Sequence, residues 1–296
     1  MIYIILDMEW DNAFFPPEKK FINQIIQIGA VKLNDAFDVT DTFEVTVRSE
    51  ITNRVTGRFS KLTGITTEMM RAGIPLKDAV LKYNEWIGEN TVTMTWSKSD
   101  LYSIMANEKY LLSGIRFKID KYLDLQSYIQ SEMRICGTEI KSQIALSAAA
   151  ELSGISTELL SLHTAKDDSL LCAELLKKYY NKSRFNALVK DTADEEFYKR
   201  LNFKSHYIDD LSSCEIDRSA FKFRCDKCGK KARRKTKWSF KNRYFTADFY
   251  CRECGEMFSA RVSFKKTYDD VIVKKRICPK GEEHGKDEVQ FVPKKV

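Results

Sequence analysis

The sequence predicts a mixed α/β domain followed by a small cysteine-rich β domain. In the first third of its 296 residues, segments rich in Ile, Val, Thr and Phe alternate with short polar connections, a pattern typical of strands. Helix-like and strand-like segments then alternate, which predicts a sheet covered by helices. After residue 218 the composition changes, and four cysteines occur as two Cys-x2-Cys pairs.

Each expected element follows from a local pattern. We expect strands at 1–9, 23–33 and 39–47, and the short connection 34–38 predicts an antiparallel hairpin between the last two. Helical periodicity predicts helices at 76–89, 139–155 and 167–181, and β-branched stretches predict short strands at 90–96 and 121–126. The resulting domains are 1–184, a partly helical linker at 185–218, and a basic cysteine-rich domain with its tail at 219–296.

Composition and charge narrow the class of protein. The chain is 43% hydrophobic and 31% charged, as in ordinary globular proteins. It contains no run of about 18 apolar residues and no basic segment before its apolar start, so we expect a cytoplasmic protein without a membrane span. Residues 213–296 carry 23 Lys and Arg against 12 Asp and Glu, whereas residues 1–212 carry 26 against 30. This asymmetry indicates different roles for the two parts.

Four carboxylates and a histidine lie where strands end or helices begin. Asp7 and Glu9 are two residues apart on the first strand, so their side chains share a face. Asp100 follows the strand at 90–96, and His163 and Asp168 precede and begin the helix near 167. Oxygen-rich sites suit Mg²⁺ or Mn²⁺, and two such ions can hydrolyse a phosphodiester while a histidine takes the proton of the water. Taken singly, such acids are usually solvated strand ends, and such a histidine is usually a surface residue.

The order of these residues supports a family resemblance. The fragments LDMEW (6–10), IIQIGAVKL (25–33), LTGIT (62–66), TWSKSDL (95–101) and HTAKDDS (163–169) resemble the successive motifs of DEDDh 3′→5′ exonucleases, over about residues 1–182. The resemblance implies a ribonuclease-H-like sheet, with Asp7, Glu9, Asp100 and Asp168 as ligands of two Mg²⁺ or Mn²⁺ ions. It also implies His163 as general base, Asp168 rather than Asp167 as ligand, and nucleoside 5′-monophosphates released from a 3′ end.

Some residues depart from the family pattern or concern the substrate. Trp10, Ser97 and Ser169 replace smaller residues that are common in the family, and none of them removes a catalytic group. LDLQ (123–126) is similar to the RNA-trimming branch, so RNA is slightly favoured over DNA. Aromatic side chains can stack on unpaired bases. Trp10 and Phe14 are therefore candidate contacts, and Leu62 is one by family analogy; burial is the alternative for each. Trp96 is expected in the core.

The two Cys-x2-Cys pairs predict a metal site. Cys225, Cys228, Cys251 and Cys254 provide two sulfur pairs with glycine directly after each, which resembles a zinc ribbon over residues 220–263. Four thiolates leave no open position, so one structural Zn²⁺ is expected. Cys278 and His284 are too few for another site, and Cys136 and Cys172 are expected to be buried thiols.

Basic and aromatic residues fill the segment between the cysteine pairs. It contains Lys231, Arg233, Arg234, Lys235, Lys237 and Trp238, a composition that favours nucleic-acid binding. The alternative is a solvated basic hairpin whose aromatic residues form the core of the ribbon. The sequence therefore predicts an exonuclease acting on single-stranded RNA or DNA, with a ribbon that grips nucleic acid. Two other hypotheses remain: a non-catalytic nucleic-acid adaptor, and a nuclease subunit whose ribbon docks a protein partner.

Overall fold

The computed structural model describes residues 1–156, 164–279 and 287–292. They form two compact units, Met1–Phe197 and Tyr198–Val296. Within these described residues, every helix is too short or too polar to cross a membrane.

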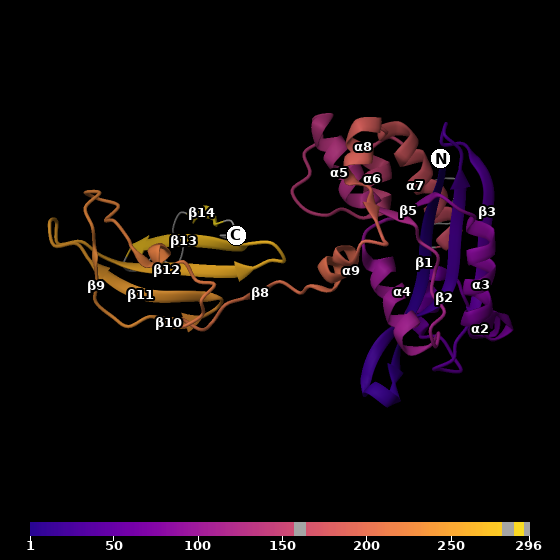
Figure 1. The fold of residues 1–296 in the computed structure, drawn as a ribbon, viewed down its shortest axis with the longest axis horizontal. Helices are drawn as coiled ribbons and strands as arrows, with labels where there is room; N and C mark the ends of the chain where they lie inside the picture. The colour runs from indigo at the N-terminus through magenta and orange to yellow at the C-terminus, as the bar shows by residue number, and fades with distance from the viewer. Residues whose placement is uncertain (157–163, 280–286, 293–296) are drawn as a thin grey trace. The chain divides into compact units, whose positions relative to one another are not determined.

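The first unit is built on a mixed seven-stranded sheet (Figure 1). Its strands run in the order β4-β3-β2-β1-β5-β6-β7. β1 pairs antiparallel with β2 and parallel with β5, which confirms the predicted mixed sheet. The strands are β1 (Ile2–Phe15), β2 (Lys20–Leu33), β3 (Val39–Arg48), β4 (Ile74–Pro75), β5 (Thr91–Thr95), β6 (Lys121–Asp124) and β7 (Lys190–Asp191).

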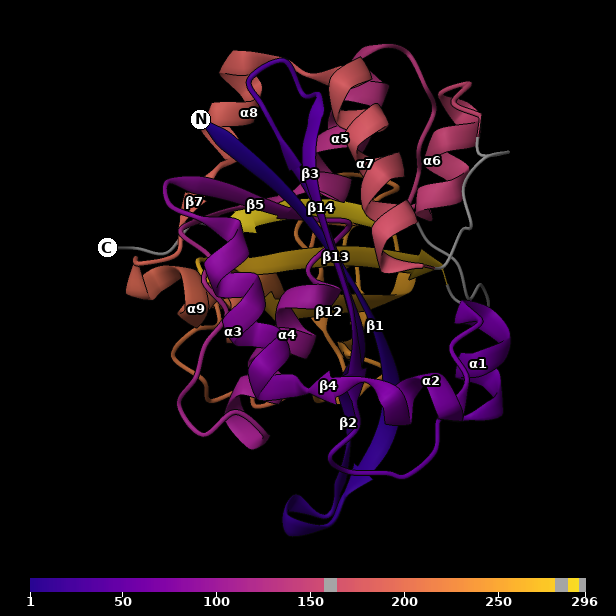
Figure 2. The same cartoon turned by 90° about the vertical axis from the view of Figure 1, so that its right-hand side faces the viewer.

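Helices cover both faces of this sheet (Figures 1 and 2). They are α1 (Gly57–Thr63), α2 (Thr67–Ala72), α3 (Leu76–Ile87), α4 (Ser99–Tyr110), α5 (Leu125–Ile135), α6 (Leu146–Leu152), α7 (Ala165–Tyr179) and α8 (Lys182–Leu188), with a 3-10 turn at Pro16–Glu18. On one face, Tyr3 and Ile5 of β1 pack in a core cluster with Leu175 and Leu176 of α7. On the other, Tyr83 of α3 lies 5.7 Å from the ring of Phe43.

The β1–β2 hairpin is longer than expected. Its ladder continues past Glu9 to the pair Phe15 and Lys20, and Phe14 meets Phe21 across the strands with ring centroids 5.4 Å apart. The register shifts between Glu9 and Trp10, whose partners are Gln27 and Ile25. The additional residue therefore lies on β2, and β1 keeps its alternation of faces.

Helix α6 is shorter than the helix predicted at 139–155, and that prediction is wrong for residues 139–145. In this segment the carbonyl groups of Ile140 and Ile144 accept side-chain hydrogen bonds from Arg134 and Gln126 of α5. These tertiary bonds replace the intrahelical ones, so local periodicity is overridden.

The second unit is an antiparallel sheet in the order β10-β11-β12-β13-β14, with β8 beside β12 and β9 beside β11. Phe245, Phe249, Phe258 and Phe264 of β11 and β12 are the large side chains of its core. The elements are β8 (His206–Tyr207), a 3-10 turn at Arg218–Phe221, β9 (Arg233–Arg234), β10 (Ser239–Lys241), β11 (Tyr244–Tyr250), β12 (Met257–Lys266), β13 (Val271–Pro279) and β14 (Asp287–Val292).

The segment expected as a linker, 185–218, contributes to both units. Phe185 is buried in the first core and β7 joins the first sheet, whereas Ile208 and Ile216 pack in the second core. The helix α9 (Glu195–Asn202) lies where the two units divide. Among the lone cysteines, Cys172 is buried as expected, but Cys136 is exposed because it follows the last turn of α5.

Candidate active site and cysteine cluster

Three of the four predicted carboxylates converge on one face of β1. Asp7, Glu9 and Asp168 each offer a carboxylate oxygen, and these oxygens all lie within 4.8 Å of one another. Asp7 and Glu9 come from β1, and Asp168 comes from the first turn of α7. Oxygen ligands gathered in this way suit Mg²⁺ or Mn²⁺.

Asp100 completes this group from the first turn of α4. Its side chain is only 2% exposed, and its Oδ1 accepts the backbone N–H of Met8 at 3.2 Å, so it reaches the strand between Asp7 and Glu9. The connection from β5 to α4 is strained at Ser97, whose φ of 93° lies in the left-handed region that favours glycine. The predicted departure from glycine at Ser97 therefore falls at a position where a side chain is costly.

Two residues of β2 fix the start of α7. The Oε1 atom of Gln27, the partner of Glu9, accepts the backbone N–H of Ala165 at 3.2 Å. Gly29, the partner of Asp7, faces the backbone of Ala165 so closely that a side chain would collide with it. Sequence reasoning did not single out these positioning residues. Their signal was a polar residue and a glycine in an otherwise apolar strand.

The carboxylates perturb one another strongly. Burial, followed by the charges of Asp100, Asp168 and Glu9, raises the pKa of Asp7 well above its usual range. Burial and the charges of Asp168 and Asp100 raise the pKa of Glu9 to about 8. Burial raises the pKa of Asp100 to about 7, although two backbone N–H groups oppose the shift. Such a cluster gains free energy when it binds cations, because they relieve both the repulsion and the cost of burial.

The remaining predicted residues of the first unit lie around this cluster. His163 falls outside the described residues, and Thr164 after it caps α7 by accepting the N–H of Asp167 at 3.3 Å. Asp167 is not part of the carboxylate cluster. Trp10 and Phe14 alternate onto the opposite face of β1 from Asp7 and Glu9. Leu62 of α1 is 53% exposed, and Trp96 packs against the first core.

The four predicted cysteines meet in the second unit. One sulfur from each of Cys225, Cys228, Cys251 and Cys254 lies within 4.8 Å of the others. The Sγ atoms of Cys225 and Cys254 are 3.6 Å apart, and those of Cys228 and Cys251 are 3.4 Å apart. A tetrahedron with metal–sulfur bonds of about 2.3 Å has edges of about 3.8 Å, so the cluster has the size of a structural metal site. Gly229 and Gly255 follow the pairs at φ 70° and 76°, which closes each turn.

The basic segment between the cysteine pairs is open to solvent. Lys231, Arg233, Arg234, Lys235 and Lys237 are all exposed. Trp238 is half-buried, and its ring lies 4.8 Å from Phe221 and 5.7 Å from Phe249. Trp238 therefore belongs to the aromatic packing of this unit. Cys278 is buried, and His284 lies outside the described residues.

A cluster of carboxylates on a mixed sheet of this order defines the class of metal-dependent nucleases with a ribonuclease-H-like fold. The chain belongs to the exonuclease family, because the family model for RNase T, described as "Exonuclease", matches residues 16–176, more than half of the chain. The match begins after β1, so Asp7 and Glu9 precede it. The predicted resemblance is thus confirmed at the level of the family.

Solved structures share the fold of the first unit. A full-length 3′-exonuclease is 19% identical, with 62% of each chain covered and a TM-score of 0.52. Cell-death related nuclease 4 is 20% identical, with 60% of this chain and 62% of that chain covered and a TM-score of 0.50. The nuclease domain of 3′hExo, a DEDDh family member bound to rAMP, is 22% identical over 60% of this chain and 90% of that chain, with a TM-score of 0.50. The chain thus covers less than two thirds of the first two, and comparison with curated proteins gives no match.

Proposed function

We propose that this chain is a divalent-metal-dependent 3′→5′ exonuclease that releases nucleoside 5′-monophosphates from single-stranded nucleic acid. The observation that carries the proposal is the convergence of Asp7, Glu9 and Asp168 within 4.8 Å, with buried Asp100 beside them. Such a cluster has a high free energy without cations, and nothing in the fold requires these acids at one place. Membership of the exonuclease family supplies the reaction class.

Each residue has a distinct part in this reaction. Asp7, Glu9, Asp100 and Asp168 would hold two Mg²⁺ or Mn²⁺ ions, which supply an activated water and neutralise the charge of the phosphodiester when bound. Asp7, which the other three acids surround electrostatically, is suited to bridging both ions. His163 is proposed as the general base, on the strength of its position in the family motif one residue before the cap of α7.

RNA is the favoured substrate, and the reason is the motif LDLQ. In the structure its polar residues serve the fold, since Asp124 caps α5 by accepting the N–H of Ser127 at 3.0 Å and Gln126 donates to the carbonyl of Ile144 at 2.9 Å. The preference therefore rests on the resemblance alone. It also agrees with a structural relative that recognises the 3′ end of a histone mRNA stem-loop, which is 20% identical to this chain.

The decisive experiment measures degradation of end-labelled single-stranded RNA and DNA in Mg²⁺ or Mn²⁺, each with a free or a blocked 3′ end. Wild type should release mononucleotides only from the free ends, whereas Asp7→Asn should lose at least 1,000-fold in rate, on the order expected when a metal ligand that orients the reaction is removed. His163→Ala should reduce the rate with unchanged metal binding. Activity on blocked ends would refute the proposed direction. Binding without any hydrolysis would favour the adaptor hypothesis.

For the second unit we propose one structural Zn²⁺ held by Cys225, Cys228, Cys251 and Cys254, and a nucleic-acid-binding role for the exposed basic segment. The sulfur spacing fits tetrahedral zinc, and the thiolates leave no position for substrate. Replacing Arg233, Arg234 and Lys235 by alanine in the full chain should weaken RNA binding and lower the salt dependence of the binding constant. Unchanged affinity and salt dependence would favour docking of a protein partner.

A further inference from the structure

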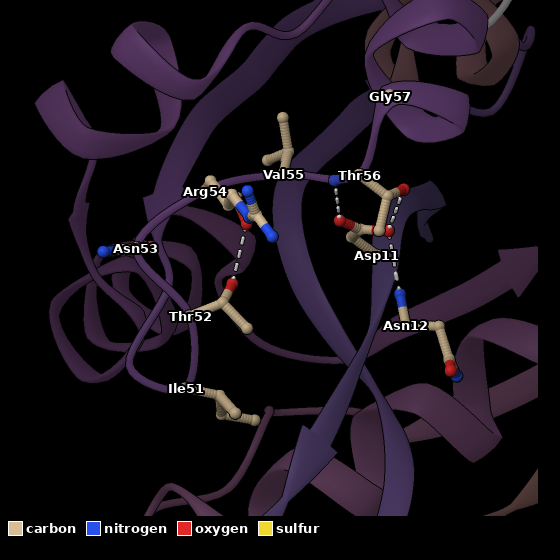
Figure 3. Close-up of a pocket in the computed structure, with 9 residues that line it drawn as sticks. All are labelled: Asp11, Asn12, Ile51, Thr52, Asn53, Arg54, Val55, Thr56 and Gly57. Atoms are coloured by element: carbon tan, nitrogen blue, oxygen red, sulfur yellow. Dashed lines mark hydrogen bonds between the residues drawn. The ribbon is translucent and has the colours of Figure 1, made fainter.

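A pocket of about 800 Å³ lies directly beside the carboxylates of β1 (Figure 3). It is lined by Asp11 and Asn12 of β1 and by the segment 51–57, including Thr52, Asn53, Arg54 and Val55. Asp11 follows Glu9 by two residues and lies on the same face of the strand. At about 3.4 Å per residue, the pocket begins about 7 Å from Glu9 along β1. Its volume is in the range of pockets that enclose a small ligand.

Two buried polar residues hold the segment over this pocket. Asp11, 5% exposed, accepts the N–H of Thr56 at 2.6 Å and its hydroxyl at 2.8 Å (Figure 3). Gln24, 2% exposed and the cross-strand partner of Asp11, donates to the hydroxyl of Thr52 at 3.1 Å and accepts the hydroxyl of Ser49 at 2.5 Å. The segment is therefore fixed to the hairpin near both of its ends.

Burying a carboxylate and an amide under an exposed loop costs free energy, which their hydrogen bonds offset only in a defined geometry. An apolar pair would cover the hairpin more simply. The polar pair instead fixes the position of the segment relative to Glu9. Preorganised segments of this kind are typical of binding sites, because no ordering cost is left for the ligand to overcome.

The chemistry of the pocket fits a nucleotide. The Arg54 side chain is exposed and forms no ion pair among the described residues, so its guanidinium is available to a phosphate. Exposed Asn12 and Asn53 provide amides for the edge of a base. The charge of Asp11 is compensated by three donors, since it also accepts the N–H of Asn12 at 3.0 Å. On α1, which follows the segment, Arg58 and Lys61 are exposed.

We propose that this pocket is a second nucleotide subsite, which takes a nucleotide on the 5′ side of the scissile bond of a single-stranded substrate. Arg54 contacts its phosphate, and Asp11 is a positioning residue that acts through Thr56. The proposal rests on the proposed exonuclease function and extends it, since it predicts that substrates longer than one nucleotide gain affinity from the segment 51–57.

The test compares a substrate that occupies only the catalytic centre with one that also reaches the pocket. The first is the p-nitrophenyl ester of thymidine 5′-monophosphate, and the second is a single-stranded decanucleotide, both assayed with the full chain in Mn²⁺. For Arg54→Ala, the ratio of kcat/KM for the decanucleotide to that for the ester should fall about tenfold, through KM, as expected for one charge-assisted hydrogen bond. Lys82→Ala, which removes an exposed cation from α3, is the matched control and should keep the wild-type ratio.

Asp11→Asn provides a second variant, because an amide cannot accept both donors of Thr56 with its two heavy atoms. It should lower the same ratio, and Thr56→Ser, which keeps both donors, should restore it to the wild-type value in an otherwise wild-type chain. An unchanged ratio in Arg54→Ala, or a parallel loss on both substrates, would overturn the subsite. If wild type hydrolyses neither substrate, the proposed function itself fails and the subsite falls with it.

Discussion

Gly29 couples the packing of α7 to the geometry of the carboxylates, so Gly29→Ala should impair both stability and activity. A Cβ atom at this position would lie 2.3 Å from the backbone C of Ala165 and the backbone N of Lys166, and 2.7 Å from the Cβ of Ala165. Backbone atoms cannot rotate out of the way as a flexible side chain can. The new methyl group must therefore displace the first turn of α7 from β2.

The size of the effect follows from this overlap. Non-bonded carbon atoms prefer a separation of about 3.5–4.0 Å, so α7 has to move by roughly 1 Å or more. Overpacking of this kind costs about 1–3 kcal/mol of unfolding free energy. Asp168 lies in the same turn and moves with it, and a misplacement of about 1 Å in a catalytic arrangement lowers the rate on the order of 100-fold.

The assay measures thermal unfolding in EDTA and the rate of decanucleotide hydrolysis in Mn²⁺. Gly29→Ala should lower the Tm of the first unit by roughly 2–12 °C, from about 2–4 °C per kcal/mol for a unit of this size. Gly57→Ala is the matched control, because a Cβ there meets no atom within 4 Å at the first residue of α1. If Gly29→Ala and Gly57→Ala are indistinguishable in both measurements, the proposed coupling is refuted.

Three further predictions concern strain, charge and metal. Ser97→Val should lower the unfolding free energy in urea by more than about 1 kcal/mol, because a β-branched residue is poorly accommodated at φ 93°, whereas Ser97→Gly should not; equal stability of the two variants would contradict this. In EDTA, the folded state binds more protons than the unfolded state while the pKa of Asp100 stands at about 7, so wild type should lose stability as the pH rises from about 4 to 7. Asp100→Asn should remove up to about 4 kcal/mol of that loss in urea titrations, and an unchanged pH slope would contradict the assignment. Cys254→Ser should reduce the zinc content below one ion per chain and unfold the second unit in circular dichroism; a chain that keeps both would exclude a structural zinc.

Much of the site was predictable because its residues carry chemistry that is rare in apolar surroundings. Asp7 and Glu9 after an apolar strand, and four cysteines in two close pairs, are recognisable in the sequence alone. The structure brings three of the four carboxylates within 4.8 Å and the four sulfurs within the same distance. Strands β2, β3 and β5 were also predicted, since their composition is dominated by β-branched and aromatic residues.

What escaped prediction depends on contacts between segments distant in sequence. The helix predicted over 139–155 shortens to α6 because α5 supplies hydrogen bonds that a local pattern cannot reveal. Asp11 reads as one more polar residue after Glu9, and only the fold shows that it is buried against Thr56, 45 residues later. Gly29 and Gln27 are likewise meaningful only once α7 is seen against them.

The length of the β1–β2 hairpin finds its explanation in register. Asp7, Glu9 and Asp11 lie on one face of β1, where the first two face Asp168 and Asp100 and the third holds the segment 51–57. A slip of one residue would turn all three carboxylates to the other face at once. The ladder from Tyr3 to Phe15 makes such a slip expensive, because every cross-strand pair would be lost with it. The extension beyond Glu9 contributes no carboxylate to the metal cluster, yet it sets the position of the pocket relative to that cluster. The same strand therefore determines where the phosphodiester is cleaved and, by our proposal, where the preceding nucleotide lies.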